Sequence, residues 1–269
     1  MPRAIVLRTA GTNCDAEMVR AFELAGARAD LVHLDRLIAD PAQLERYDLV
    51  AFPGGFSYGD DIASGRIFAM RARERLYPAL RAAAQRGCPM IGACNGFQIM
   101  VQIGLLPGPD AAWPLDEPPA QTVALAHNAG GSFIDQWVRV EYPASSPCIW
   151  TRGIAEHFPS QHRHDALRLP IAHGEGRFVP SSPDVLESLE RNGQIAVRYA
   201  DNVNGSANAI AGICDPTGRI FALMPHPERY LSWFNHPYWT RLDAGLRTHE
   251  TPGLLMFRNA VESVSSVVV

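Results

Sequence analysis

The sequence contains no lysine, so all 24 basic residues among its 269 are arginine. An amine of this kind is required by phosphate-binding loops of the Gly-Lys-Ser type, by the Schiff base of pyridoxal phosphate enzymes and by Ser-Lys dyads. The absence of lysine therefore excludes these three chemistries from the chain.

Closely spaced cysteine pairs are also missing. The five cysteines are scattered and show no Cys-x-x-Cys spacing: Cys14, Cys88, Cys94, Cys148 and Cys214. Such a set favours neither a disulfide framework nor a structural zinc site, and it is typical of a reducing compartment. We therefore predict that the chain holds no metal.

Long apolar runs and dense basic clusters are lacking as well. The N-terminal apolar run, residues 4–7, is too short for a signal peptide, and no segment approaches the length of a membrane span. The formal net charge is −4, and the Arg-rich stretch 71–75 has the pattern of a solvated helix face. We expect a soluble, cytoplasmic protein that binds neither membrane nor nucleic acid.

The first half of the chain alternates strand and helix signals, a pattern that builds parallel sheets with right-handed crossovers. Strands are predicted at 4–7, 30–34, 49–52 and directly before Cys94, and helices at 15–25, 62–86 and directly after Cys94. The expected fold is α/β, with a doubly wound, mostly parallel sheet flanked by helices. Ligands of such sheets bind beyond the carboxyl ends of the strands.

The second half carries antiparallel hairpin signals that add to this sheet. Strands are predicted at 134–142, 166–172, 194–199, 210–214 and 220–224, with the turn Asp215-Pro216-Thr217-Gly218 between the last two. Residues 106–119 are rich in Pro, Gly and Asp, which predicts an exposed loop. We predict a single domain, residues 1–269, with a core over about 4–230 and a C-terminal extension, 231–269, for packing or a partner contact.

The segment Gly92-Ala93-Cys94-Asn95-Gly96 lies where an apolar run changes to a helical pattern. Glycines two positions to either side of Cys94 are typical of a nucleophile elbow, a strained strand-to-helix turn that exposes its central residue. A buried cysteine without such neighbours is usually a small apolar residue. The glycines therefore favour Cys94 as a thiol nucleophile.

His226 and Glu228 follow the predicted strand 220–224. A histidine at the carboxyl end of a strand reaches the place where open α/β sheets bind ligands. Residues two apart on an extended strand end share a face, so we predict that Glu228 accepts the second ring N–H of His226 and fixes its tautomer. Cys94, His226 and Glu228 are thus the predicted nucleophile, base and orienting carboxylate.

A glycine-rich turn, Pro53-Gly54-Gly55-Phe56-Ser57-Tyr58-Gly59, follows the predicted strand 49–52. Acyl transfer needs donors for a developing oxyanion, and each contributes roughly two to three orders of magnitude in rate. The backbone N–H groups of Gly55 and Asn95 are the predicted pair. Taken alone, the turn is equally compatible with an ordinary tight turn, and it lacks the pattern of a phosphate-binding loop.

In these motifs the sequence resembles the class I (triad) glutamine amidotransferases. The resemblance rests on the Gly-x-Cys-x-Gly-x-Gln segment 92–98, the Pro-Gly-Gly turn and the His-Pro-Glu segment 226–228. Within that family, five segments are similar to the glutaminase components of phosphoribosylformylglycinamidine synthases: Gly-Thr-Asn-Cys-Asp at 11–15, Pro-Gly-Gly-Phe-Ser-Tyr-Gly-Asp at 53–60, Cys-Asn-Gly-Phe-Gln at 94–98, Pro-Ile-Ala-His-Gly-Glu-Gly-Arg at 170–177 and Met-Pro-His-Pro-Glu-Arg at 224–229.

The resemblance implies an enzyme that hydrolyses glutamine to glutamate and ammonia through a γ-glutamyl thioester on Cys94. His226 is then expected to carry the proton, with Glu228 orienting it. By analogy with the glutamine pocket of the family, Gln98 and Gly54 are the expected substrate-binding residues. His173 is expected to line the site or the path to a partner, although a lone histidine is equally typical of a loop stabiliser.

The resemblance also implies a partner, because ammonia released into neutral water is protonated and loses its nucleophilic lone pair. The expected partner is a larger synthetase subunit that makes formylglycinamidine ribonucleotide in de novo purine biosynthesis, with a small bridging subunit in split systems. ATP and Mg are expected on that partner, and no cofactor in this chain. Residues 56–61 and 174–177 are the expected docking region.

Two alternatives stay open. A triad glutaminase could serve another acceptor, such as a pyridoxal phosphate synthase, although segments 53–60 and 172–176 favour the purine pathway. A non-catalytic interaction module could keep the fold without turnover, against which the intact catalytic residues argue. The loop 106–119, the tail after Arg229 and the small Ala93 depart from the family pattern without touching those residues.

Overall fold

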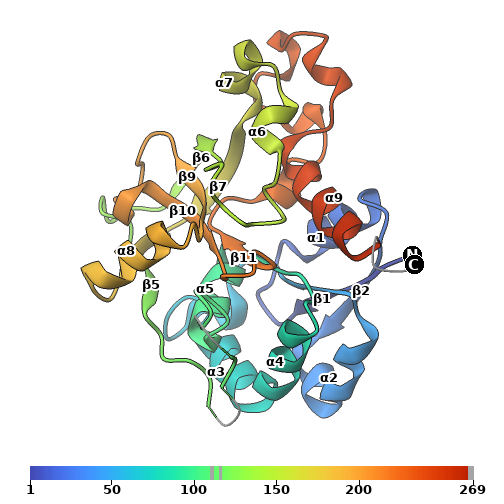
Figure 1. Ribbon diagram of the computed structural model, residues 1–269, viewed down its shortest axis with the longest axis vertical. Coiled ribbons are helices and arrows are strands. Elements are labelled where there is room, and N and C mark those ends of the chain that lie inside the picture. The colour runs from blue at the N-terminus through green and yellow to red at the C-terminus, as the bar shows by residue number, and fades with distance from the viewer. Residues whose placement is uncertain (110–111, 115–116, 266–269) are drawn as a thin grey trace.

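The computed structural model describes residues 1–109, 112–114 and 117–265. Its centre is a nine-stranded sheet with the strand order β2-β1-β3-β4-β11-β10-β9-β6-β7 (Figure 1). Parallel strands occupy one half of this sheet and antiparallel strands the other. The α/β fold predicted from the sequence, with antiparallel additions in the second half, is confirmed.

The parallel half brings three loops together at the carboxyl ends of its strands. Its strands, in spatial order, are β2 (Arg28–His33), β1 (Arg3–Arg8), β3 (Leu49–Phe52), β4 (Met90–Ala93) and β11 (Ile220–Leu223). Phe52 lies opposite Gly92, and Leu223 lies opposite Ala93. Because these neighbours are parallel and in register, the carboxyl ends of β3, β4 and β11 lie side by side.

The antiparallel half comprises β10 (Ile210–Cys214), β9 (Ile195–Tyr199), β6 (Ile134–Glu141) and β7 (Arg168–His173). β10 and β11 form the predicted hairpin. In its turn, Asp215 accepts hydrogen bonds from the backbone N–H groups of Thr217 and Ile220 at 3.2 and 2.8 Å. A carboxylate that satisfies turn amides in this way favours the turn over an extended connection.

Helices cover both faces of the parallel half, as Figure 1 shows. One face carries α1 (Asp15–Leu24) and α9 (Pro252–Ser265), and the other carries α3 (Arg66–Arg75), α4 (Tyr77–Gln85) and α5 (Asn95–Ile103) beside the short α2 (Leu34–Ala39). Alternate residues of a strand pack into two hydrophobic cores, one on each face of the sheet. Val6 packs in the cluster under α1, and Leu7 packs in the cluster under α3 and α5. Strands covered on both faces read as continuous apolar runs, which is why they are visible in the sequence.

The helical region predicted at 62–86 is divided in the structure. Gly65, in a left-handed conformation with φ 73°, precedes α3. The next helix starts again at Tyr77, with a proline in its first turn. Proline is tolerated at a helix start but cannot donate within a continuing helix, so the division follows from Pro78.

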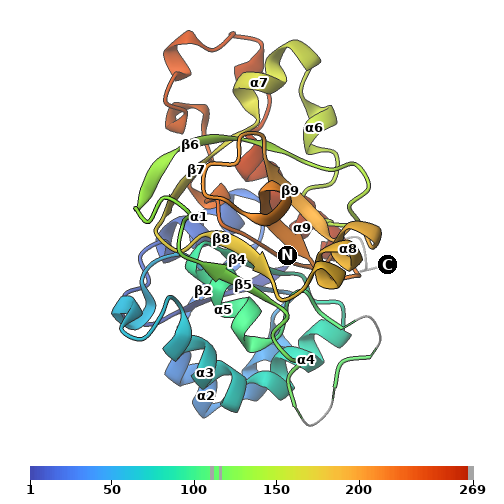
Figure 2. The ribbon, with the colours of Figure 1, turned by 90° about the vertical axis from the view of Figure 1, so that its left-hand side faces the viewer.

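The elements that were not predicted include the two-stranded sheet of β5 (Val123–Ala126) and β8 (Arg177–Pro180), and the helix α8 (Pro183–Arg191). Phe178 of β8 stacks on Phe97 of α5, with ring centroids 6.4 Å apart. This contact anchors the small sheet, and with it the loop that precedes β8, beside the helix that follows Cys94 (Figure 2).

The C-terminal extension forms a lobe and a final helix. Residues 231–250 lie beside α6 (Ile154–His157) and α7 (Arg163–Ala166) at the top of Figures 1 and 2. The rings of Trp233 and Phe158 meet edge to face with centroids 6.1 Å apart, so aromatic packing joins residues 231–250 to the segment that follows α6. The helix α9 then returns to the sheet. Val267, Val268 and Val269, together with part of the predicted loop 106–119, lie outside the described residues.

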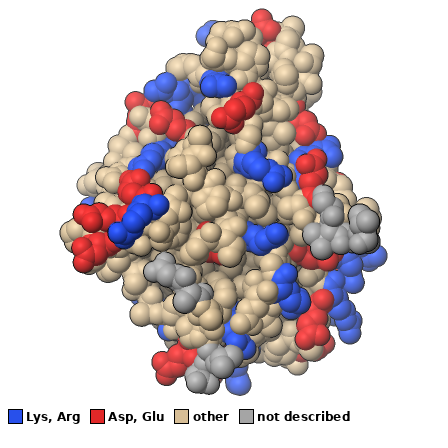
Figure 3. All heavy atoms as spheres, in the orientation of Figure 1, with Lys and Arg blue, Asp and Glu red and all other residues tan. Residues whose placement is uncertain are grey.

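No helix in the described ranges is long and apolar enough to cross a membrane. Figure 3 shows acidic and basic side chains interspersed over the face that it presents. An interspersed pattern provides no extended basic surface for a phosphate backbone on that face.

Candidate active site

Cys94, His226 and the glycine-rich turn meet where three parallel strands end. Cys94 follows β4 directly, Gly54 comes two residues after β3, and His226 comes three residues after β11. The backbone N–H of Cys94 donates to the carbonyl of Leu223 at 2.8 Å, which fixes the turn after β4 to the end of β11. The register of the sheet thus brings together residues that are far apart in the sequence.

The turn at Cys94 has the strained backbone that the flanking glycines predict. Cys94 adopts φ 52° and ψ −108°, a backbone conformation that residues other than glycine rarely adopt. A Cβ on Gly96 would lie 1.9 Å from the carbonyl oxygen of Phe52, and one on Gly92 would lie 2.7 Å from the carbonyl oxygen of Gly96. Neither contact is possible, so both glycines are required for strand and helix to pack this closely around the thiol.

His226 and Glu228 form a buried pair. Nδ1 of His226 lies 2.7 Å from Oε1 of Glu228, and the two side chains are 2% and 0% exposed. The sequence-based expectation of an extended strand end was wrong, because Pro227–Arg229 form a turn of 3-10 helix. Proline starts that turn, which folds the carboxylate back onto the ring. The predicted contact therefore forms by a different backbone route.

The surroundings of His226 favour its protonated form. Burial lowers the pKa of His226, but the Glu228 carboxylate and the sulfurs of Cys94 and Cys14 raise it, and the pKa lies well above its ordinary value. An imidazole held in this way can keep its proton beside a thiolate. The Sγ of Cys94 itself lies 3.7 Å from the carbonyl oxygen of Ala172.

A second thiol, Cys14, lies beside the same imidazole, and sequence reasoning missed its place in the site. Its Sγ is 3.8 Å from Nδ1 of His226 and accepts a hydrogen bond from Nη2 of Arg229 at 3.1 Å. Burial raises the pKa of the Cys14 thiol, outweighing the opposing effects of His226 and Arg229. The segment 11–15 was visible as a motif, but its proximity to His226 depends on the turn after β1 packing against Gly54.

The two glycines of the Pro-Gly-Gly turn have different surroundings. Gly55 adopts φ 138°, forms a bridge with Thr12 and lines the pocket in front of Cys94. A Cβ on Gly54 would lie 2.6 Å from Cε1 of His226, so this glycine leaves room for the imidazole. Asn95 begins α5 immediately after the thiol.

Asn95 and Gln98 connect the walls of the pocket through their side chains. Nδ2 of Asn95 donates to Oε1 of Gln98 at 3.0 Å, and Oδ1 of Asn95 accepts from the backbone N–H of Ser57 at 3.3 Å. Nε2 of Gln98 donates to the carbonyl oxygen of Glu175 at 2.6 Å. The helix after Cys94 thereby holds both the turn after β3 and the loop before β8.

His173 ends β7 and lines the same pocket. Its Nδ1 lies 3.1 Å from Oδ1 of Asn128, an acceptor, so the ring proton is on Nδ1. Burial, and next the charge of nearby His226, lower the pKa of His173 to about 4. Its Nε2 has no hydrogen-bond partner among the described residues. His173 is thus a neutral imidazole that stabilises a loop and also lines the site.

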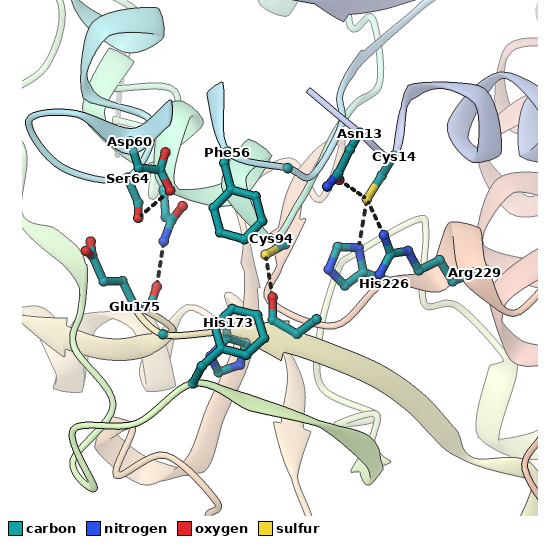
Figure 4. Close-up of a pocket in the computed structure, with 15 residues that line it drawn as sticks. Asn13, Cys14, Phe56, Asp60, Ser64, Cys94, His173, Glu175, His226 and Arg229 are labelled. Atoms are coloured by element: carbon teal, nitrogen blue, oxygen red, sulfur yellow. Dashed lines mark hydrogen bonds between the residues drawn. The ribbon is translucent and has the colours of Figure 1, made fainter. Parts of the chain in front are cut away.

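Figure 4 shows the pocket that these residues surround. Cys94 lies at its centre, with His226, Arg229 and Cys14 on one side and Asp60, Ser64 and Glu175 on the other. Two aromatic rings at the mouth, Phe56 and Phe133, stack with centroids 6.4 Å apart, and both are about half exposed. The segments expected to dock a partner, 56–61 and 174–177, contribute Phe56, Asp60, Gly174 and Glu175 to this lining.

Within the described residues, the one group with spacing suited to a metal ion is Cys14, His226 and Glu228. The 2.7 Å between Nδ1 of His226 and Oε1 of Glu228 is a charge-assisted hydrogen bond. Two ligands of one tetrahedral zinc ion, each about 2.1 Å from the metal, would lie farther apart. The observed geometry therefore suits proton transfer better than metal binding.

Comparisons with known proteins identify the family. A sequence model described as a CobB/CobQ-like glutamine amidotransferase domain matches residues 1–264. The phosphoribosylformylglycinamidine synthase subunit PurQ of Dehalococcoides mccartyi is 40% identical over 267 residues, which cover 97% of this chain and 96% of that protein. The chain belongs to the PurQ family of glutamine amidotransferases. The PurQ subunit of Archaeoglobus fulgidus is 35% identical over 279 residues, covering 97% of this chain and 96% of that protein.

Solved structures support the same family and fold. A chain in the structure of PurLQS from Thermotoga maritima has a TM-score of 0.70 and 32% identity, with 98% of this chain and 99% of that chain covered. A glutamine amidotransferase from Thermotoga maritima matches with a TM-score of 0.52 at 16% identity, covering 98% of this chain and 97% of that chain. The second likeness shows the fold alone. The family resemblance seen in the sequence motifs is confirmed.

Proposed function

We propose that this chain is the glutaminase of a phosphoribosylformylglycinamidine synthase and supplies ammonia for de novo purine biosynthesis. The observation that carries the proposal is the buried His226–Glu228 pair, with 2.7 Å between Nδ1 and Oε1, placed beside a cysteine on a strained elbow. The PurQ relatives support the purine acceptor over the alternative of a pyridoxal phosphate synthase.

The first half-reaction transfers the γ-glutamyl group to Cys94. The thiolate attacks the amide carbon of glutamine, a C–S bond forms, and the carbonyl electron pair moves to oxygen. The N–H groups of Gly55 and Asn95 are the proposed donors to that oxyanion. The His226 imidazolium then gives its proton to the amide nitrogen, the C–N bond breaks and ammonia leaves.

The second half-reaction releases glutamate. Neutral His226 takes a proton from water, whose oxygen attacks the thioester carbon. Collapse of the tetrahedral intermediate breaks the C–S bond and restores the thiolate beside an imidazolium. Glu228 accepts the Nδ1–H bond throughout, which fixes the tautomer and stabilises the positive charge of the ring.

The released ammonia requires a second active site close at hand. The Thermotoga structure named PurLQS contains the matching chain, which supports an assembly of this chain with a larger synthetase subunit. We propose that ATP and Mg act on that subunit, that a small bridging subunit joins the assembly, and that docking involves residues 56–61 and 174–177 around the mouth.

The test is a comparison of two nitrogen donors in the assembled synthase. Cys94→Ser is expected to abolish glutamine-dependent synthesis of formylglycinamidine ribonucleotide while leaving ammonia-dependent synthesis intact. Ser146→Ala, a substitution outside the pocket, is the control and is expected to retain both activities. Unchanged glutamine turnover in Cys94→Ser would contradict the nucleophile assignment, and loss of both activities would contradict the division of labour between subunits.

A further inference from the structure

The strands β6 and β7, which lie side by side in Figure 1, carry two arginines directly opposite each other, Arg139 and Arg168. The backbone N–H of Val140 donates to the carbonyl oxygen of Leu167 at 3.0 Å. On the other edge of β6, the carbonyl oxygen of Arg139 accepts from the N–H of Ala200 at 3.1 Å. The two arginines are therefore a non-hydrogen-bonded pair, the kind in which facing side chains come closest. Like charges in such a position destabilise a sheet, so an anion between them would stabilise it.

The guanidinium group of Arg168 has donors that the rest of the fold does not use. Within the described residues its Nε is buried without a hydrogen-bond partner, and the group forms no ion pair with a carboxylate. Burial lowers the pKa of His236, and the charge of Arg168 lowers it further, against the smaller opposing effect of the Asp165 charge. The Arg168 charge thus acts on its surroundings without being neutralised by an adjacent acid.

Arg139 is compensated only weakly. Its Nη2 lies 3.3 Å from Oδ2 of Asp201, and the two side chains are 37% and 76% exposed. An ion pair between side chains this exposed contributes little and is readily exchanged for another partner. Arg139 can therefore give up Asp201 to an anion that also reaches Arg168.

A cavity of about 130 Å³ joins these groups. Arg139, Arg168 and Asp201 line it together with residues 136–138 and Val203, and it shares no lining residue with the pocket around Cys94. Arg168 begins β7 and His173 ends it, so the cavity lies roughly 17 Å along the strand from the catalytic pocket. It is a separate site with room for a small oxyanion.

We propose that Arg139 and Arg168 bind a phosphate group, which takes the place of Asp201 on Arg139 and removes the repulsion between the two facing charges. A guanidinium group presents its N–H donors as a fork that bonds two oxygens at once. A phosphate group has at least three acceptor oxygens and can bond both forks, whereas a carboxylate has two. Inorganic phosphate and the phosphate of a sugar monoester share this chemistry.

The test measures the urea unfolding of the full chain against phosphate concentration, with sodium chloride keeping the ionic strength constant. A ligand that binds only the folded state raises its stability in a saturable way, which gives the dissociation constant. Phosphate is expected to stabilise the wild type beyond the effect of chloride. Arg168→Gln is expected to weaken phosphate binding by roughly tenfold or more, because charge-assisted hydrogen bonds are lost.

Asp201→Asn should have the opposite effect. It removes the carboxylate that competes for Arg139, so phosphate should bind up to about fivefold more tightly. Arg152→Gln is the matched control, because it removes the same positive charge as Arg168→Gln from an exposed residue outside the cavity. This control is expected to keep the wild-type affinity for phosphate.

The same titration with ribose 5-phosphate distinguishes the two sources of the phosphate group. Tighter binding of ribose 5-phosphate than of inorganic phosphate assigns the site to a sugar monoester, and tighter binding of inorganic phosphate assigns it to the free ion. Stability in chloride alone checks the fold of the variant: Arg168→Gln should be at least as stable as the wild type, because the facing like charges are gone.

Three results overturn the proposal. The first is a wild type that neither phosphate compound stabilises beyond chloride. The second is an unchanged phosphate affinity in Arg168→Gln, or a weakened one in Asp201→Asn. The third is an Arg168→Gln chain that is less stable than the wild type in chloride, because Arg168 would then be compensated within the fold.

Discussion

Replacement of Glu228 by Gln tests the role of the buried pair most quantitatively. The substitution keeps the shape of the side chain but removes its charge, 2.7 Å from Nδ1 of His226 at a position with 0% exposure. A hydrogen bond to a charged group contributes about 1.5–3 kcal/mol, which corresponds to roughly 10-fold to 100-fold in rate. A Gln amide can also donate to Nδ1, which would place the ring proton on the nitrogen that has to serve the thiol.

Both effects act in the same direction, so we expect kcat for glutamine hydrolysis to fall by about 100-fold or more. The Glu228 charge raises the pKa of His226. Its removal therefore moves the basic limb of the pH–rate profile, where the imidazolium loses its proton, to lower pH. Glutamate release measured across the pH range reports both changes.

The matched control is Glu250→Gln, which removes the same charge from a partly exposed pair with Arg258 at 2.8 Å. Such pairs contribute about 0–1 kcal/mol to stability, and this one lies outside the pocket, so activity should be unchanged. A Glu228→Gln enzyme within about threefold of the wild type, with an unshifted basic limb, would refute the assigned role of the carboxylate.

Three further outcomes follow from the same geometry. Gly96→Ala places a Cβ 1.9 Å from the Phe52 carbonyl oxygen and should lower the free energy of unfolding, measured in urea, by about 3 kcal/mol. Gly130→Ala adds a Cβ where there is open space and should leave this free energy unchanged. Equal stabilities of the two variants would contradict the packing argument. The pKa of His173 is lowered to about 4 in the folded chain, so the free energy of unfolding should be highest above pH 6.5 and should fall by about 3 kcal/mol as the pH falls toward 4 and the buried ring is protonated. His173→Gln should remove this pH-dependent part of the unfolding free energy. Identical stability–pH profiles for the two proteins would contradict the argument. Cys14→Ser should retain glutaminase activity, because this thiol touches His226 from the Glu228 side, and inactivity matching that of Cys94→Ser would assign it a catalytic role.

The parts of the site that sequence predicted are those with local signals. Gly92 and Gly96 indicate the elbow because only glycine fits beside Phe52 and Met100. The hairpin before His226 is visible because Asp215-Pro216-Thr217-Gly218 separates two apolar runs. Burial on both faces of β3, β4 and β11 makes each strand a continuous apolar run.

The parts that sequence did not predict depend on contacts between distant segments. β5 and β8 are four residues each and, within the described ranges, pair only with one another, so neither carries a clear pattern of its own. The approach of Cys14 to His226 spans 212 positions and requires the packed turn at Gly54. By contrast, α8 had usable signals, since Ser182 caps its first turn and Pro183 occupies its first position.

In the proposed mechanism Cys94, and not the neighbouring Cys14, carries the γ-glutamyl group. Acid quenching of the assembled synthase during glutamine turnover, followed by peptide mass spectrometry, measures this directly. We expect one γ-glutamyl group on the peptide that contains Cys94 and none on the peptide that contains Cys14. A γ-glutamyl group on Cys14, or turnover that never labels Cys94, would contradict it.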